Sequence, residues 1–386
     1  MESFRKIYWP AINLIGPGAI QEIGVEVKNL GFKKLLIVTD KILRQVGVVK
    51  MVTDVLDASN INYVIYDEVK PNPTTKNVND GLGMFKEEGC DSLLSIGGGS
   101  PQDTAKAIGI LYTNGGSIVE YEGIGKSKYK SAPIIAVNTT AGTASEVTIN
   151  YVITDEVRKT KMVIVDPNCL ATIAVNDPEL MVNKPAGLTA ATGMDALTHA
   201  VEAYVAKGAF RLSDTLALEA IKFIGESLET AVNDGKNIEA RSKMAWASYI
   251  AGLAFSNCGL GAVHSMAHQL GSEYDLPHGV ANAILLPFVE EYNSVVCPEK
   301  FRDIAEALGK DTKGLSLEEA RKAALDAIKE LSVKVRIPML KDTAFRLEDV
   351  DKLAKQAMAD VCTGGNPREV TADDIKKIYK NAFEAK

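Results

Sequence analysis

The sequence contains few cysteines, and their pattern is not that of a disulfide framework or a zinc finger. The 386 residues include five cysteines, scattered along the chain without a Cys-x-x-Cys pair. Small secreted domains are typically rich in paired cysteines, whereas cytoplasmic proteins keep their thiols reduced. The stretch from Met1 to Asn13 also lacks the apolar core of a secretory signal. We therefore expect a protein of the cytoplasm.

Long hydrophobic runs and an excess of basic residues are also missing. The most apolar stretch, Ala281 to Val289, is shorter than the ~20 residues of a membrane-spanning helix and contains Pro287. Lysine and arginine total 43 against 50 aspartates and glutamates, which gives a formal net charge of -7. Nucleic acids are bound by basic surfaces. The sequence thus predicts neither a membrane protein nor a nucleic-acid-binding protein.

The first 180 residues alternate short β-rich runs with amphipathic helical stretches, and repeats and low-complexity segments are absent. Strands are expected at Lys34–Asp40, Asn62–Tyr66, Ser92–Ile96 and Pro133–Asn138, helices at Asn77–Glu88 and Pro101–Leu111, and a further β-rich segment at Ile149–Val165. Strand–helix–strand alternation indicates a mainly parallel sheet covered by helices.

Helical patterns dominate after about residue 182, among them Leu188–Ala206 and Leu260–Tyr274. Two capping boxes, Ser316 to Glu319 and Thr371 to Asp374, indicate helix starts at which side-chain oxygens accept hydrogen bonds from free amides. The predicted organisation is an α/β Rossmann-like nucleotide-binding domain over residues 1–181 and an all-helical domain over 182–386.

A glycine-rich turn, residues 97–100, follows an apolar strand and precedes Pro101, which is favoured at the first position of a helix. One glycine there would indicate an ordinary turn. Three in a row let the backbone approach a ligand closely, and a helix N-terminus attracts a pyrophosphate. The Gly-x-Gly-x-x-Gly fingerprint is absent. Asp40, at the end of its strand, could accept hydrogen bonds from ribose hydroxyls or could simply be a turn or cap residue.

All four histidines of the chain lie within one 80-residue window. Asp195 and His199 are four residues apart and share one helix face. His264 and His268 are also one turn apart, and His278 follows Pro277 in an expected loop. A lone histidine is usually a core residue, but a buried carboxylate beside this cluster needs a counter-charge. Mixed oxygen and nitrogen donors suit iron or zinc, and spacing does not identify which histidines bind.

Four segments together resemble the iron-containing (group III) alcohol dehydrogenase family over essentially the full chain. They are GGGSPQDTAKAIG (97–109), TTAGTASEVT (139–148), TAATGMDALTHAVEAYV (189–205) and GLGAVHSMAHQLGSEYDLPHGVANAILLP (259–287). The resemblance implies a two-domain plan like that of dehydroquinate synthase, in which the helical domain binds the metal. It implies Asp195, His199, His264 and His278 as ligands, and His268 as a catalytic residue close to the nicotinamide that does not bind the metal.

The same resemblance implies NAD as the cofactor and Fe²⁺ as the metal, with Zn²⁺ as the alternative. The positions that match cofactor contacts are Asp40, Asn72, Gly98, Gly99, Ser100, Thr139, Thr140 and Lys161. Those expected to line the substrate pocket are Asn150, Phe255 and Cys362. The family also implies a homodimer or a higher homo-oligomer.

The resemblance implies hydride transfer between the nicotinamide and a small alcohol or aldehyde, with the metal as Lewis acid. The segments at 146–155 and 360–369 are similar to those of members that interconvert lactaldehyde and 1,2-propanediol. Alternatives within the family are 1,3-propanediol, ethanol and methanol. Arg211 would favour an anionic aldehyde such as sulfoacetaldehyde if it faced the active site, and is otherwise a solvated charge.

Three rival functions differ in class. A metal-dependent lyase of the dehydroquinate synthase type also binds NAD, but it would need more basic groups near the metal segments than this sequence has. A metallohydrolase without a nucleotide leaves the glycine turn and Asp40 unexplained. A binding protein without catalysis leaves the buried carboxylate and the histidines unexplained.

Overall fold

The computed structural model describes residues 4–385, which fall into two compact units. One unit is Ile7–Asn183, and the other contains residues 184–385 together with residues 4–6. The sequence predicted a boundary after residue 181, and the chain divides after residue 183. No helix formed by residues 4–385 combines the length and the apolar character needed to cross a membrane.

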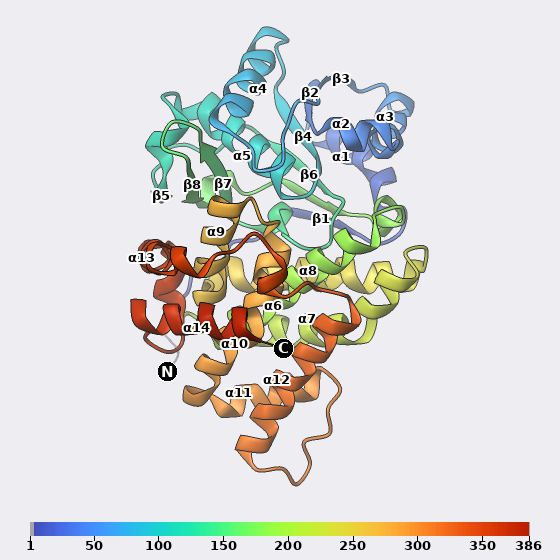
Figure 1. Ribbon diagram of the computed structural model, residues 1–386. Helices are drawn as coiled ribbons and strands as arrows, with labels where there is room; N and C mark the ends of the chain where they lie inside the picture. The colour runs from blue at the N-terminus through green and yellow to red at the C-terminus, as the bar shows by residue number, and fades with distance from the viewer. Residues whose placement is uncertain (1–3, 386) are drawn as a thin grey trace. The chain divides into compact units, whose positions relative to one another are not determined.

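A six-stranded sheet forms the centre of the first unit, and all neighbouring strands in it run parallel (Figure 1). In spatial order the strands are β1 (Ile12–Ile15), β9 (Ile173–Asn176), β6 (Ile134–Asn138), β4 (Ser92–Gly97), β2 (Lys34–Val38) and β3 (Asn62–Tyr66). Every residue of β4 and β6 is buried, as expected for parallel strands that helices cover on both faces.

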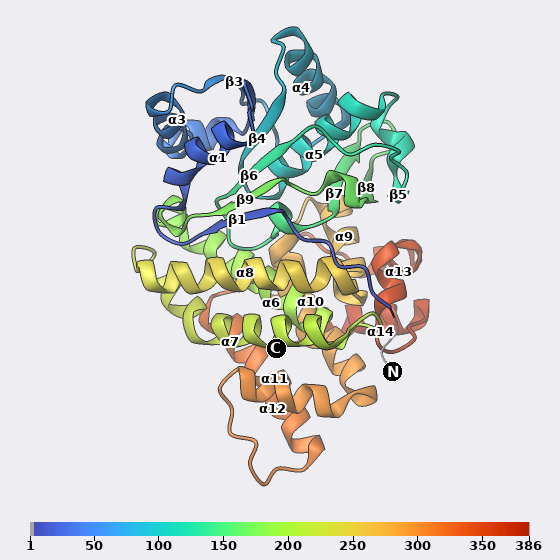
Figure 2. The ribbon, with the colours of Figure 1, turned by 180° about the vertical axis from the view of Figure 1, so that it is seen from behind.

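Alternate residues of a strand point to opposite faces of the sheet, and each face has its own core. Leu36 and Val38 of β2 belong to a core shared with α4 and α5, whereas Leu35 and Ile37 belong to a core shared with α1 and α3. Figure 2 shows this sheet from behind. The helices of the unit are α1 (Ile23–Asn29), α2 (Lys41–Gln45), α3 (Val48–Ala58), α4 (Thr75–Glu87) and α5 (Gly99–Asn114).

A smaller sheet of three strands adjoins α5 in the same unit. Its order is β5 (Gly123–Ile124), β8 (Thr160–Val165) and β7 (Asn150–Asp155), and β7 pairs with β8 as an antiparallel hairpin. The predicted β-rich segment at 149–165 is this hairpin. Short 3-10 helices connect the elements: η1 (Ala19–Glu22), η2 (Ile118–Tyr121), η3 (Ser145–Val147), η4 (Pro167–Cys169) and η5 (Pro178–Met181).

Within the described residues, the second unit is entirely helical. Its α-helices are α6 (Ala186–Val205), α7 (Arg211–Asn233), α8 (Ile238–Cys258), α9 (Ala262–Tyr274), α10 (His278–Asn293), α11 (Pro298–Ala307), α12 (Leu317–Lys334), α13 (Val350–Ala359) and α14 (Ala372–Glu384). Its 3-10 helices are η6 (Ser294–Val296), η7 (Leu340–Asp342), η8 (Leu347–Asp349) and η9 (Val361–Gly365). Both predicted capping boxes are present, at the starts of α12 and α14. The predicted fold class, a parallel α/β part followed by a helical part, is confirmed.

Helix α6 is buried along most of its length, and it packs against α7, α8 and α10. Its buried residues are mostly small, which lets neighbouring helices approach closely. At Gly193, for example, an added Cβ would lie 2.2 Å from the side chain of Leu228 in α7. A helix that is apolar on nearly all sides belongs in a core, so any polar side chain on α6 has to find its partners there.

Four sequence expectations need correction. Strands β1 and β9 were not predicted. The strand expected at Lys34–Asp40 is therefore the second strand along the chain and not the first. That strand ends at Val38, and Asp40 is the N-cap of α2. Helix α5 begins at Gly99 rather than at Pro101. His278 is the first residue of α10 and does not lie in a loop, because Pro277 ends the preceding segment and is the N-cap.

Candidate functional site

Asp195 and His199 project from the same face of α6, one turn apart, and both are almost fully buried. The imidazole of His199 stacks on the ring of Phe255 in α8, with 4.3 Å between the ring centroids and 16° between the planes. Phe255 was expected in the substrate pocket, and this stacking places it directly beside the predicted metal ligand.

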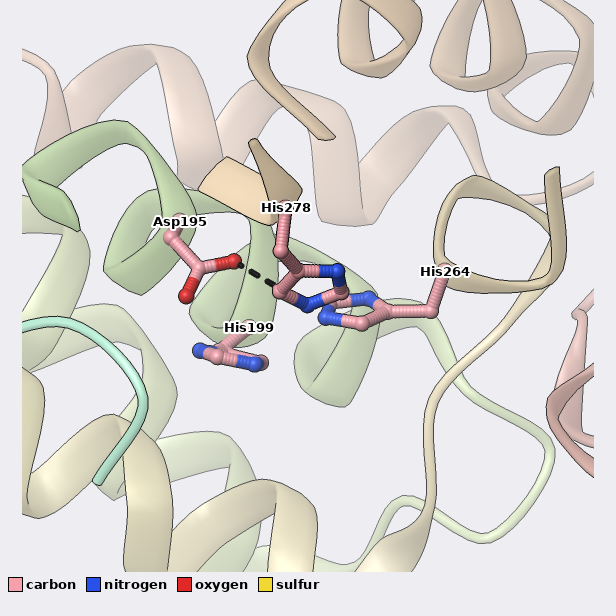
Figure 3. A group of neighbouring side chains, drawn as sticks. All are labelled: Asp195, His199, His264 and His278. Atoms are coloured by element: carbon pink, nitrogen blue, oxygen red, sulfur yellow. Dashed lines mark ion pairs between the residues drawn. The ribbon is translucent and has the colours of Figure 1, made fainter. Parts of the chain in front are cut away.

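Helix α10 brings His278 to this face because of the glycine that follows it. A Cβ at Gly279 would lie 2.3 Å from the carbonyl oxygen of Ala191 in α6 and 3.3 Å from the Cβ of Asp195. Only glycine therefore permits this approach of the two backbones. Because the two backbones lie so close, His278 Nε2 is 3.6 Å from Asp195 Oδ1 (Figure 3).

His264, in the first turn of α9, completes a group of four side chains that point toward one another (Figure 3). One donor atom from each of Asp195, His199, His264 and His278 lies within 4.8 Å of the others. The structure thus brings together the four residues that the sequence predicted as ligands. His268 is not in this group, although it lies on the same helix as His264.

Two further side chains belong to the cluster and were missed in the sequence. The amide nitrogen of Asn282 lies 2.7 Å from Asp195 Oδ1 and 3.1 Å from Nε2 of both His264 and His278. Glu202 accepts a hydrogen bond from the backbone N–H of Val263 at 2.7 Å and contacts Nδ1 of His264. Helical spacing could have found both, since Asn282 lies one turn after His278 and Glu202 follows His199 by three residues.

Glu202 determines which nitrogen His264 offers to the cluster. Burial and the neighbouring imidazoles lower the pKa of His264 well below its ordinary value, which favours neutral imidazole. With Nδ1 in contact with the carboxyl group of Glu202, Nε2 is the nitrogen that faces the other three side chains. A histidine that donates its other nitrogen to a carboxylate is the usual arrangement at protein metal sites.

These residues fit a divalent transition metal ion. One carboxylate oxygen and two ring nitrogens, all atoms that can bind a metal, converge on the single amide nitrogen of Asn282. Among residues 4–385, no lysine or arginine forms an ion pair with the buried Asp195 carboxylate. A cation would satisfy the converging lone pairs and compensate the carboxylate. Three imidazoles and one carboxylate suit iron or zinc.

His268 belongs to a different group, with Asp360 and Cys362. Its Nδ1 lies 2.8 Å from Asp360 Oδ2. Its ring stacks on that of His278 with 5.4 Å between the centroids. His268 is therefore a neighbour of the four-residue cluster. Cys362, which was predicted for the substrate pocket, lies in η9 and belongs to this same group.

In the α/β unit, most of the predicted cofactor residues lie at the carboxyl ends of three neighbouring strands, β2, β4 and β6. β2 and β4 are neighbours in the sheet. From β2 the chain proceeds to β3 at one edge of the sheet, and from β4 it proceeds to β6 in the opposite direction, so the strand order reverses between β2 and β4. Nucleotides typically bind outside the carboxyl ends of strands at such a point. Asp40 follows β2, and the glycine turn follows β4.

The two polar turns of this unit contact each other. A Cβ at Gly98 would lie 2.5 Å from the Thr140 side chain, and the backbone N–H of Thr139 donates to the Gly97 carbonyl at 3.1 Å. Gly98 and Gly99 with Ser100 form the N-terminus of α5, where free amides attract phosphate. Asp40 Oδ1 accepts a hydrogen bond from the Leu43 N–H at 2.9 Å. Asp40 therefore caps α2, as one of its two expected roles required.

The remaining predicted residues of this unit lie on the small sheet and beside it. Lys161 Nζ in β8 donates to Asn72 Oδ1 at 2.9 Å, which brings two predicted cofactor positions together. Asn150 is the first residue of β7, and its carbonyl accepts a hydrogen bond from the buried Lys106 Nζ at 2.8 Å. Asn150 thus lies in the α/β unit, whereas Phe255 and Cys362 lie in the helical unit.

Comparison with known families covers nearly the whole chain. Residues 10–178 match the family described as iron-containing alcohol dehydrogenase, and residues 189–383 match the Fe-containing alcohol dehydrogenase family, C-terminal. The class of protein is therefore an oxidoreductase that acts on alcohols.

Individual relatives agree with this. The chain is 51% identical to lactaldehyde reductase of Escherichia coli (strain K12), over 95% of this chain and 97% of that protein. It is 46% identical to the NAD-dependent methanol dehydrogenase of Bacillus methanolicus, over 97% and 98%. The crystal structure of a 1,3-propanediol oxidoreductase superposes with a TM-score of 0.97 at 47% identity and covers 99% of this chain and 100% of that one. The chain belongs to the iron-containing alcohol dehydrogenase family and is an NAD-dependent enzyme.

Proposed function

We propose that this enzyme interconverts lactaldehyde and 1,2-propanediol with NAD(H), and that Asp195, His199, His264 and His278 hold Fe²⁺. The observation that carries the chemistry is the convergence of these four donors within 4.8 Å. The substrate is inferred from the 51% identity to a lactaldehyde reductase. Zn²⁺ is the alternative metal, because the same donors suit it.

When bound, the ion supplies Lewis acidity that favours negative charge on the substrate oxygen. Glu202 orients His264, and Gly279 lets His278 approach Asp195. Hydride transfer to an aldehyde leaves an oxygen that needs a proton. With Nδ1 of His268 directed at Asp360, Nε2 is the nitrogen that holds or passes this proton. His268 is therefore the proposed catalytic residue.

Phe255, Cys362 and Asn150 are the proposed pocket residues. Phe255 lies flat against His199 and is 5% exposed, so it forms a rigid apolar wall that limits the size of the substrate. For the nucleotide, we propose contacts with Asp40, Asn72, Gly98, Gly99, Ser100, Thr139, Thr140 and Lys161. The free amides at the start of α5 suit the pyrophosphate.

Other small alcohols are the alternatives, since relatives at 46% to 48% identity are named for methanol and 1,3-propanediol. An anionic aldehyde is a weaker candidate. Arg211, which would have to bind it, is the exposed first residue of α7 and thus has the solvated position of an ordinary helix-end charge. Family membership decides against the lyase, the hydrolase and the binding protein.

Steady-state kinetics with NADH test the substrate. Lactaldehyde should have a higher kcat/KM than propionaldehyde, its matched control without the 2-hydroxyl. 3-Hydroxypropionaldehyde, formaldehyde and sulfoacetaldehyde complete the panel. A wide preference for sulfoacetaldehyde that is lost in Arg211→Ala would replace the proposal with the anionic one.

Metal analysis tests the ligand set. His264→Ala and His278→Ala should lose bound metal and activity together, whereas His268→Ala should keep the metal and lose activity. A metal-free His268→Ala protein beside a loaded His278→Ala protein would overturn the assignment.

We further propose a cytoplasmic homodimer or higher homo-oligomer. Light scattering of the purified protein measures its mass directly, and a monomeric mass would rule out the assembly.

A further inference from the structure

A second group of donor atoms lies beside the four-residue cluster and shares none of its members. One donor atom from each of His268, Asp360 and Cys362 lies within 4.8 Å of the others. The rings of His268 and His278 are 5.4 Å apart, so the two groups are neighbours. The side chains of His268 and Asp360 are 13% and 8% exposed, so the group is enclosed but still reachable from solvent.

The group is held by its scaffold. Asp360 Oδ1 accepts a hydrogen bond from the backbone N–H of Cys362 at 2.9 Å, which leaves Oδ2 directed at Nδ1 of His268. Thr363 Oγ1 donates to Ser265 Oγ at 2.8 Å and so ties η9 to α9. The donors therefore come from two connected elements, and little conformational freedom is lost when they converge on one ion.

The donor set differs in kind from that of the first cluster. Nitrogen, oxygen and sulfur donors together select ions such as Zn²⁺ and Co²⁺, whereas Mg²⁺ and Ca²⁺ prefer oxygen alone. A carboxylate and a thiolate together neutralise the charge of a divalent ion, which reduces its repulsion from an ion in the four-residue cluster. Bond lengths of about 2.0–2.3 Å place tetrahedral donors about 3.5 Å apart, which side-chain rotation can supply from the present separations.

We propose that His268, Asp360 and Cys362 form a second, inhibitory site for a thiophilic divalent ion such as Zn²⁺. On binding, Cys362 loses its thiol proton to solvent and bonds through sulfur, while Asp360 bonds through oxygen. His268 bonds through Nδ1, and the hydrogen of its imidazole moves to Nε2. No electrons are transferred. Inhibition follows because Nε2 can no longer accept a proton, and this consequence rests on the catalytic role proposed for His268.

Titration of the metal-free protein with Co²⁺ tests the site without measuring activity. The first cluster contains no sulfur, so a thiolate-to-cobalt charge-transfer band reports an ion bound by a cysteine outside that cluster, and the cysteine variants identify which one. Wild type should take up a second equivalent of Co²⁺ with this band. Cys362→Ser and Asp360→Asn should take up one equivalent without it. Cys297→Ser, a matched control at another half-buried cysteine, should behave like wild type.

A further variant separates this proposal from the proposed function. Asp195→Asn removes a donor of the first cluster only, so it should weaken uptake of the first equivalent and keep the thiolate band. In kinetic assays of the iron-loaded enzyme, added Zn²⁺ should inhibit wild type, and the fractional inhibition should be much smaller in Cys362→Ser. A wild-type protein that takes up one equivalent without a thiolate band, or a band that persists in Cys362→Ser, would overturn the second site.

Discussion

Replacement of Gly279 by alanine should weaken metal binding, although Gly279 supplies no ligand. The added Cβ would lie 2.3 Å from the carbonyl oxygen of Ala191 and 2.8 Å from its carbonyl carbon. Both are backbone atoms of α6, so no side-chain rotation relieves the contact. The first turn of α10 therefore has to move away from α6, and His278, the preceding residue, moves with it.

The required displacement is about 1 Å, since Cβ contacts below 3.0 Å essentially never occur and those of 3.0–3.4 Å are already tight. Ligand distances at metal sites are held to within about 0.2 Å. A 1 Å retreat of His278 thus removes it from an ion shared with Asp195. Loss of orienting contacts at metal sites lowers affinity by about ten- to hundredfold, and loss of a ligand should cost at least as much. Overpacking should also lower the free energy of unfolding by about 1–3 kcal/mol.

The assay combines metal content after dialysis with thermal unfolding in the presence and absence of added Fe²⁺ or Zn²⁺. Wild type should be stabilised by the metal, because an ion that binds only the folded state raises its stability. Gly279→Ala should retain little metal and show little stabilisation. Gly187→Ala, in the first turn of α6 with no neighbour within 4 Å of its Cβ, is the matched control and should behave like wild type. A Gly279→Ala protein with full metal content would refute the reasoning.

Three further predictions concern charge. Asp40→Gly should raise kcat/KM with NADPH by about one to two powers of ten, because the 2′-phosphate of NADPH no longer meets a carboxylate. Steady-state kinetics with NADH and NADPH measure this, and an unchanged kcat/KM with NADPH would show that Asp40 does not face the ribose. Burial raises the pKa of Asp103 from 3.8 to about 6, so its ionisation destabilises the folded state by about 3 kcal/mol, a penalty that is absent below pH 3.8 and complete above pH 6. Asp103→Asn should therefore lose less stability than wild type between pH 4 and 6 in denaturant unfolding, and parallel pH profiles would contradict this. Glu202→Gln should bind metal about ten- to hundredfold more weakly in chelator competition, and unchanged affinity would exclude its role at His264.

The central strands and the metal helix could be predicted because their signals are local. Apolar runs followed by glycine or polar turns predicted β2, β3, β4 and β6, and capping residues predicted the starts of α12 and α14. Asp195 and His199 lie one turn apart on a helix, so their meeting depends on helical geometry alone. Each of these features is decided within about ten residues of sequence.

Strands β1 and β9 and the start of α10 were missed because their cause is not local. β1 has four half-buried residues, and its partner, β9, begins with Ile173 opposite Ile12. Such a short edge strand has no distinctive pattern before its distant partner is known. At the start of α10, Pro277 and Gly279 flank His278 and favour a loop. The glycine is needed in the helix for its close approach to α6, and packing outweighs its low helix propensity.

The different fates of His264 and His268 show what helical spacing leaves undecided. They lie one turn apart on α9, and their rings are 6.1 Å apart, so helical spacing alone does not separate a ligand from a neighbour. Each Nδ1 instead faces its own carboxylate, that of Glu202 for His264 and that of Asp360 for His268, 62 and 92 residues away in sequence. A ring whose Nδ1 contacts a carboxylate directs its Nε2 toward other neighbours, so these acids on α6 and beside η9 decide the orientation of each ring. Spacing determines which side chains can meet, and the distant carboxylates determine which nitrogen each histidine presents and to which neighbours.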